Sequence, residues 1–121
     1  MGSKFLIIDD GATERHLLTK LLEELGHKAD TAETTEGAIP KIAKGNYSAV
    51  FLDIVMPDED GYKFLRNLRA NADTSKQYVI LCSTKRTKLE IEYGIKRGAD
   101  DYLPKPVTKE SLQGALQKLG L

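Results

Sequence analysis

The chain has 121 residues, the length of one ordinary domain, and 40% of them are hydrophobic, which is enough for a single buried core. Its 18 Lys and Arg residues balance 18 Asp and Glu residues, so no long-range field favours nucleic acid or an anionic membrane. Cys82 is the single cysteine, and the apolar run Phe5–Ile8 is too short for a signal peptide or a membrane span. We therefore expect one cytoplasmic domain over residues 1–121, without nucleic-acid binding or membrane insertion.

Short apolar runs enclosed by polar or turn residues predict buried strands. They are Phe5–Ile8, Ala49–Leu52, Tyr78–Cys82 and the shorter Tyr102–Leu103. A polar run, Ala29–Ala32, predicts a fifth strand. Because central strands of a parallel sheet are apolar on both faces, the polar run and the shortest run belong at the sheet edges.

Helical patterns lie between these runs. Leucines at helical spacing precede Gly26 and Gly120, which predicts a first and a last helix that end near these glycines. The apolar spacing within Gly61–Leu68 predicts a third helix, with Asp58 or Asp60 as its cap. These elements follow the strands in regular alternation along the chain.

Two of the expected helices have less regular patterns. Thr35 is a candidate cap for a helix over Ala38–Ala43, but Pro40 would then lie beyond the first turn, so we expect a kink or a late start. Apolar residues alternate with charged residues or glycine over residues 89–95, which locally favours a strand. We still predict a helix there, because a parallel connection between the last two strands needs a crossover.

The alternation of strand and helix predicts an α/β fold with a doubly wound, five-stranded parallel sheet and helices on both faces. The polarity of the edge strands favours the flavodoxin-like strand order 2-1-3-4-5. Ligands in such folds bind beyond the carboxyl ends of the strands. The residues that follow each apolar run are therefore the first candidates for a functional site.

These positions hold three carboxylates, a hydroxyl and an amine. The residues are Asp9, Asp10, Asp53, Ser83 and Lys105. Three adjacent carboxylates raise one another's pKa values unless a cation compensates their charge. Mg²⁺ suits them, because it takes oxygen ligands and commonly needs only one or two protein carboxylates plus a phosphate. The Lys105 ammonium can hold a phosphoryl oxygen as a point charge.

Four motifs carry a resemblance to a known family. They are Ile7-Ile8-Asp9-Asp10, Phe51-Leu52-Asp53-Ile54-Val55-Met56-Pro57 with Asp60-Gly61, Leu81-Cys82-Ser83, and Gly98-Ala99-Asp100-Asp101-Tyr102-Leu103-Pro104-Lys105-Pro106. The chain resembles, over its whole length, the receiver domains of bacterial two-component response regulators, including the stand-alone chemotaxis regulator. The resemblance implies a phosphoacceptor switch rather than an enzyme that turns over external substrates.

The resemblance also implies roles at the site. Asp53 would take a phosphoryl group from the phosphohistidine of a sensor histidine kinase or a histidine phosphotransfer protein. Asp10, Asp53 and the Val55 carbonyl would bind Mg²⁺, with Asp9 acting through a metal-bound water. The ion and Lys105 would neutralise charge on the transferring group, which is the main source of catalysis in phosphoryl transfer.

A conformational switch is implied in the same way. Ser83 would move to hydrogen-bond a phosphoryl oxygen, and Tyr102 would turn inward into the space that Ser83 leaves. This remodels the face formed by the fourth helix, the fifth strand and the fifth helix, which a downstream target protein would bind. No output domain is expected, and the family also implies a cis peptide between Lys105 and Pro106.

Three residues near the expected site depart from the usual family pattern. Val55 stands where rapidly self-hydrolysing members have a polar side chain, and Lys85 is also unusual. Because Val55 cannot orient a water molecule by hydrogen bonding, we expect a longer-lived phosphoryl group than in the chemotaxis regulator. Thr84 stands where alanine or glycine is common, and its bulk is expected to narrow the approach to Asp53.

Other functions fit the sequence less well. An aspartyl phosphatase would need a second aspartate where Val55 stands, and a flavin carrier would need a phosphate loop without the acidic Asp9–Asp10 pair. The main alternative is a phosphorylation-independent receiver-like binding module. Such modules usually lack a residue of the site, whereas this chain has the full set.

Overall fold

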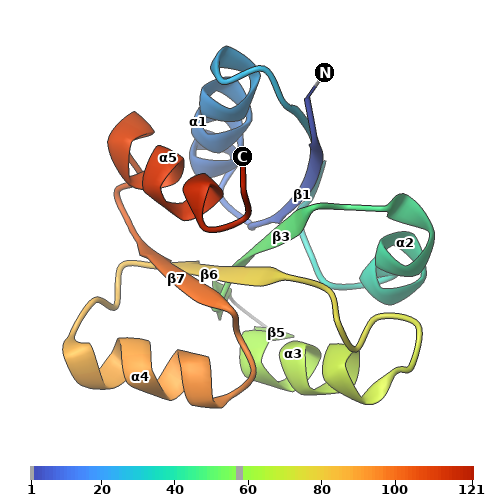
Figure 1. Cartoon of the computed structure of the whole chain (residues 1–121). Coiled ribbons are helices and arrows are strands. Elements are labelled where there is room, and N and C mark those ends of the chain that lie inside the picture. The colour runs from blue at the N-terminus through green and yellow to red at the C-terminus, as the bar shows by residue number, and fades with distance from the viewer. Residues whose placement is uncertain (1, 57–58) are drawn as a thin grey trace.

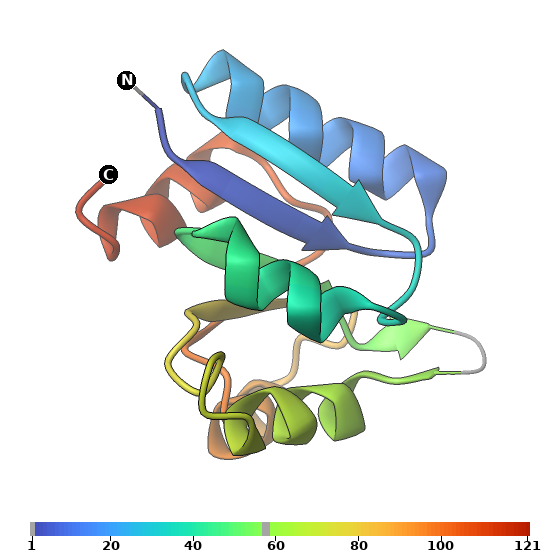
Figure 2. The same ribbon diagram turned by 90° about the vertical axis from the view of Figure 1, so that its right-hand side faces the viewer.

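Five parallel strands form the central sheet of the computed structural model, which describes residues 2–56 and 59–121. Across the sheet they are β2 (Lys28–Ala32), β1 (Lys4–Ile8), β3 (Ala49–Asp53), β6 (Val79–Ser83) and β7 (Asp101–Pro104). The predicted order 2-1-3-4-5 is therefore confirmed. Figure 2 shows β1 and β2 side by side and running in the same direction.

Helices cover both faces of this sheet, as the doubly wound fold predicts (Figure 1). One face carries α1 (Ala12–Glu24) and α5 (Lys109–Gln117), and the other carries α2 (Ala38–Gly45), α3 (Gly61–Ala70) and α4 (Lys88–Lys96). In the described part of the chain, no helix combines the length and the apolar character needed to cross a membrane.

The core has two layers, because successive side chains of a strand point to opposite faces. Leu52 and Leu81 pack with the residues of α2 and α3, whereas Phe51 and Cys82 pack with those of α1 and α5. Every residue of β3 and β6 is buried. The strands predicted to lie at the edges do so, and β2, the more polar of them, has no fully buried residue.

The start of α2 corrects one expectation and supports another. The N-cap is Gly37, in the left-handed region with a φ of 71°, and not Thr35. The helix starts late, at Ala38, so Pro40 falls within the first turn, where a missing N–H costs no helical hydrogen bond. At α3 the cap is Asp60, whose carboxylate accepts from the backbone of Tyr62 and Lys63, while Asp58 lies outside the described residues.

The alternating segment at residues 89–95 forms the helix α4, as predicted. Thr87 and Glu90 make reciprocal hydrogen bonds at its start, which fixes the first turn. Only Gly94 is fully buried, and Leu89 is 78% exposed. The apolar alternation therefore arises because α4 exposes several large side chains, not because the segment is a strand.

A short hairpin that the sequence did not predict follows β3. It pairs β4 (Val55–Met56) with β5 (Glu59–Asp60) in an antiparallel arrangement, with Val55 opposite Asp60. Two-residue strands are too short to produce a recognisable periodicity. The hairpin fixes the backbone of Val55 directly after the carboxyl end of β3.

Arg69, in the last turn of α3, links three segments at the opposite end of the sheet. Its guanidinium donates to the carbonyls of Gly98, Ser75 and Gln77 and forms a 2.9 Å ion pair with Asp100. The same Asp100 carboxylate accepts from the Val79 backbone at the start of β6. This network fixes α3 against the strands that carry the site.

We expect Arg69→Met to lower the free energy of unfolding by about 2 kcal/mol, because it leaves several partly buried acceptors without a donor. Arg69→Lys should recover only part of this loss, since an ammonium cannot span the same acceptors. Urea denaturation measures both changes. The matched control is Arg66→Met, an exposed position of the same helix, and an equal effect there would contradict the assigned role of Arg69.

Candidate functional site

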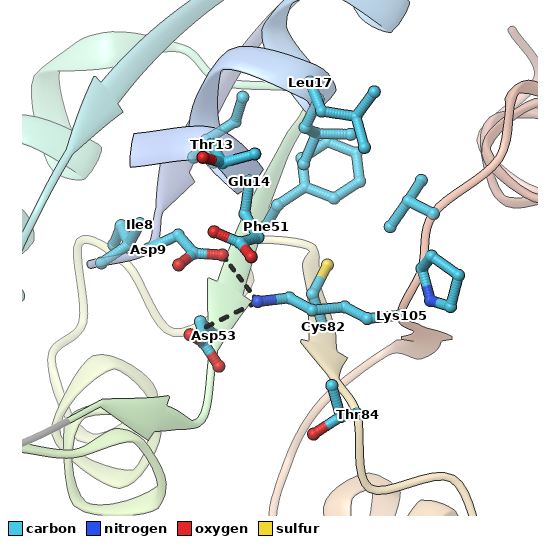
Figure 3. Close-up of a pocket in the computed structure, with 14 residues that line it drawn as sticks. Ile8, Asp9, Thr13, Glu14, Leu17, Phe51, Asp53, Cys82, Thr84 and Lys105 are labelled. Carbon is cyan, nitrogen blue, oxygen red and sulfur yellow. Dashed lines mark hydrogen bonds and ion pairs between the residues drawn. The ribbon is translucent and has the colours of Figure 1, made fainter. Parts of the chain in front are cut away.

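Three carboxylates meet where β1 and β3 end. Asp9 and Asp10 directly follow β1, and Asp53 is the last residue of β3. One oxygen from each lies within 4.8 Å of the others. Asp9 and Asp53 are each only 5% exposed, whereas Asp10 is exposed to solvent. Figure 3 shows Asp9 and Asp53 on either side of the Lys105 ammonium.

Asp9 is held in place by its own loop and by Lys105. One carboxylate oxygen accepts from the Gly11 backbone at 2.9 Å, and the other accepts from the Lys105 Nζ at 2.9 Å. The Asp9 carbonyl accepts from the Arg15 side chain at 2.7 Å, and Arg15 also contacts Glu33. These contacts fix the turn that presents the two adjacent carboxylates.

Asp53 contacts both a backbone donor and the Lys105 ammonium. Its Oδ1 accepts from the Val55 backbone at 2.9 Å, and its Oδ2 lies 3.5 Å from the Lys105 Nζ. Burial raises the pKa of Asp53 to about 6, although the Val55 hydrogen bond and the Lys105 charge act in the opposite direction. The negative charge of Asp9 adds to the rise in this pKa.

Lys105 supplies the positive charge between the two buried acids. It follows β7, and its backbone donates to the Ser83 carbonyl at 2.8 Å. The peptide between Lys105 and Pro106 is cis, as the resemblance implied. Burial alone lowers the pKa of Lys105, but the hydrogen bond to Asp9 and the charge of Asp53 outweigh burial and raise it.

Ser83 and Tyr102 lie on neighbouring strands beside this cluster. Ser83 is buried, and its Oγ accepts from the Lys85 backbone at 3.1 Å. The Tyr102 side chain points inward and is 8% exposed, with its hydroxyl donating to the Lys85 carbonyl. Its ring lies against Gly94 of α4, where an added Cβ would come within 3.2 Å of the ring.

Two of the residues noted as unusual, Thr84 and Val55, are exposed near the site. Thr84 is exposed and lines the same pocket as Asp53 and Lys105, at the lower edge of the view in Figure 3. Val55 is 51% exposed. Cys82 also borders the pocket, but burial raises the pKa of its thiol to about 12, so it stays protonated and unreactive at neutral pH.

The donor set of this site fits a hard divalent cation. Among the described residues, one ammonium, that of Lys105, forms ion pairs with this group of three carboxylates. The cluster therefore retains net negative charge. Carboxylate oxygens are the ligands that Mg²⁺ prefers. Asp10 is the acid best placed to hold such an ion, because it is exposed and has no ion pair with any residue that the structure describes.

Sequence reasoning missed several residues on α1. Thr13, Glu14 and Leu17 line the same pocket as Asp9 and Asp53 (Figure 3). The available signal was their position, because residues in the first turns of a helix that follows a strand lie near that strand's carboxyl end. Their residue types gave no indication of a site.

Comparison with known proteins identifies the family. The model of the response regulator receiver domain matches residues 5–117 of the chain. Protein PilH of Pseudomonas aeruginosa is 37% identical over 110 residues, which cover 91% of each chain. Protein PilG of the same organism is 35% identical over 116 residues, which cover 96% of this chain and 86% of PilG.

Solved structures share the same fold. The receiver domain of a sensor histidine kinase from Pseudomonas aeruginosa PAO1 superposes with a TM-score of 0.87 at 24% identity, over the whole of both chains. That structure has a magnesium ion coordinated in its active site cleft. The family match, the two relatives and the fold agree, and the chain belongs to the response regulator receiver domain family.

Proposed function

We propose that this receiver domain is a switch operated by phosphorylation of Asp53. The observation that carries the proposal is the position of the Lys105 ammonium, 2.9 Å from Asp9 and 3.5 Å from Asp53, within a cluster of three carboxylates. The phosphoryl donor would be a sensor histidine kinase or a histidine phosphotransfer protein, as is general for the family. The chain would assist its own phosphorylation and dephosphorylation without acting on other substrates.

In this proposal an Asp53 oxygen forms a bond to phosphorus while the phosphorus–nitrogen bond of the donor histidine breaks. The carboxylate must be ionised to attack, and a pKa near 6 leaves most of Asp53 ionised at neutral pH. Lys105 would turn from Asp53 toward a phosphoryl oxygen and balance its charge. Asp9 keeps the ammonium in reach through a second contact.

A bound Mg²⁺ would neutralise charge on the transferring group. We assign its direct ligands to Asp10, Asp53 and the Val55 carbonyl, with Asp9 acting through water. The acidic cluster supports this assignment, and the magnesium ion in the related kinase receiver domain is a precedent for the fold.

The output of the switch is assigned to the face formed by α4, β7 and α5. Ser83 would move to bond a phosphoryl oxygen, and the inward Tyr102 would stabilise the resulting loop through Lys85. Exposed Leu89, Tyr93 and Ile95 give α4 an apolar surface that a target protein can bury. Phosphorylation would shift the population of loop conformations that orient this surface.

The alternative is a receiver-like module that binds its partner without phosphorylation. The inward position of Tyr102 favours it, because the side chain on which the switch depends already has its buried arrangement in this structure. The two functions differ in whether Asp53 reacts, so one chemical test separates them.

We expect one phosphoryl group to be added to the protein when it is incubated with Mg²⁺ and acetyl phosphate or phosphoramidate. Intact-mass spectrometry measures the addition. It should be absent from Asp53→Asn and strongly reduced when EDTA removes the metal. Asp73→Asn is the matched control, because this exposed acid lies outside the cluster.

Failure of the wild type to react with either donor would contradict the proposal as it stands. Thr84→Ala then distinguishes the causes. Addition to that variant would show that the threonine blocks small donors, whereas no addition would favour the phosphorylation-independent module.

The raised pKa of Asp53 also makes stability depend on pH in the metal-free protein. The pKa of Asp53 is near 3.8 in the unfolded chain and near 6 in the folded protein. As the pH rises, the carboxyl therefore loses its proton in the unfolded chain before it does so in the folded protein. Stability contributed by protonated Asp53 is therefore complete below about pH 4 and is lost as the pH rises through 6. Asp53→Asn removes this dependence, because its amide stays neutral.

We expect Asp53→Asn to be more stable than the wild type by about 3 kcal/mol at pH 7.5 in EDTA, and nearly equal to it near pH 3.5. Urea denaturation at a series of pH values measures the difference. Asp73→Asn should follow the wild type throughout. A constant difference across the series would mean that burial of the Asp53 charge is not its source.

Val55 is expected to prolong the life of the phosphoryl group, because its apolar, half-exposed side chain gives an attacking water no hydrogen bond. Val55→Asn should shorten the half-life of phosphorylated Asp53 about three- to tenfold, as one added hydrogen bond allows. Mass spectra taken over time after removal of the donor measure the decay. Leu89→Asn is the control, because it introduces the same polar residue at a distant exposed site. Equal half-lives for Val55→Asn and the wild type would contradict the expected effect of Val55 on phosphoryl lifetime.

A further inference from the structure

A cavity of about 270 Å³ adjoins the acidic cluster. It lies between α1, the face of the sheet that carries α1 and α5, and the segment Lys105–Val107 that follows β7. In Figure 3 the α1 residues Thr13 and Leu17 border it on one side, with Phe51 and Cys82 of the sheet behind it. Exposed Thr13, Glu14 and Leu17 mark where it opens to solvent, and Asp9, Asp53 and Lys105 line its polar part.

The walls of the cavity are mainly apolar. Leu18 and Phe51 are buried, and Leu17 and Val107 stand at its edge. Water inside such a space finds few hydrogen-bond partners, and wall atoms without a neighbour lose dispersion contacts. A hydrocarbon group would restore these contacts without leaving a polar group unsatisfied.

The size of the cavity limits what can fill it. An apolar cavity of about 150 Å³ is large enough to bind benzene. The larger volume here, about 270 Å³, accommodates one aromatic ring with a short alkyl chain. The cavity is too small for a long acyl chain or a polycyclic cofactor.

The charges at the opening define the polar end of the ligand. Lys105 is already paired with Asp9 and Asp53. Glu14 also lines the opening, and its carboxylate has no ion pair within the ranges 2–56 and 59–121. It reaches back over Gly11, where an added Cβ would lie 2.0 Å from its Oε2. An anionic ligand is repelled here, whereas a cation gains a charge-assisted hydrogen bond.

We propose that this cavity binds a small amphipathic amine. The hydrocarbon part lies against Leu18, Phe51 and Val107, and the ammonium group donates to Glu14 at the opening. Amine binding does not require phosphorylation, because none of these four residues belongs to the proposed phosphoacceptor or metal set. A bound amine would lie next to Asp53 and Lys105, so its concentration could modulate access to the phosphorylation site.

The test uses three probes of similar size: 2-phenylethylamine, 2-phenylethanol and 3-phenylpropionate. Isothermal titration calorimetry of the whole chain in Mg²⁺ buffer measures their dissociation constants. We expect the neutral alcohol to bind with a constant on the order of 1 mM. The amine should bind about three- to tenfold more tightly because of the Glu14 contact, and the carboxylate more weakly than the alcohol.

Two variants separate the apolar and the charged contributions. Val107→Phe fills the cavity and should abolish binding of the alcohol and the amine, while Leu89→Phe, on exposed α4, should leave both unchanged. Glu14→Gln should reduce amine binding to the level of the alcohol, while Glu24→Gln, at the far end of α1, should not. Asp53→Asn should still bind the amine, so failure of phosphorylation would not affect this result.

Intermolecular nuclear Overhauser effects between the amine and the methyl groups of Leu18 and Val107 in the wild type provide a test that needs no variant. Their presence supports the site even if Val107→Phe does not fold. The proposal would be overturned if neither the alcohol nor the amine bound at a concentration 10-fold above the expected dissociation constant. It would also be overturned if folded Val107→Phe still bound either of them.

Discussion

The contact of one ammonium with two buried carboxylates is the interaction on which the arrangement of this site depends. Asp9 and Asp53 end neighbouring strands, and their charges repel at a place where little water can screen them. Lys105 offsets the repulsion only because the chain after β7 brings it back across the ends of β1 and β3. Three parts of the sequence far apart from one another must therefore fold together before any of these charges is tolerated.

The same constraint leaves the cluster with unbalanced negative charge. Burial raises the pKa of Asp53, and the charge of Asp9 adds to the rise, because one ammonium cannot compensate three carboxylates. Asp10, the third carboxylate, is open to solvent. The site therefore gains stability from added positive charge, which is the requirement for coupling to a cation. An Asp53 carboxylate that is mostly ionised at neutral pH yet poorly solvated is also the state that the proposed phosphoryl transfer needs.

Much of this could be predicted from the sequence, because the relevant signals were local. Apolar runs such as Ala49–Leu52 located the strands, and the polar residues that follow them located the site without any three-dimensional information. The expected helix over Ala38–Ala43 began at the right residue, but its cap was wrongly assigned to Thr35, because Gly37 in the left-handed conformation takes that position. The β4–β5 hairpin was too short to leave a pattern.

The cavity beside the site could not be predicted for a different reason. Its existence depends on the volume left between Leu17 and Val107, two residues separated by most of the chain. Periodicity identifies which residues face the core, but not whether their volumes fill the space between the elements. Packing defects of this kind become visible only when the side chains are placed.

The alternation of side chains along β3 and β6 has a consequence for how such a protein can diverge. Phe51 and Cys82 face the cavity side of the sheet, whereas Leu52 and Leu81 face the layer that contains Tyr102. A single thickness of backbone separates the two layers, so substitutions that reshape one leave the packing of the other intact. Under the two proposals above, substitutions on one side would change the ligand of the cavity and those on the other the partner of α4, without altering the residues at the strand ends.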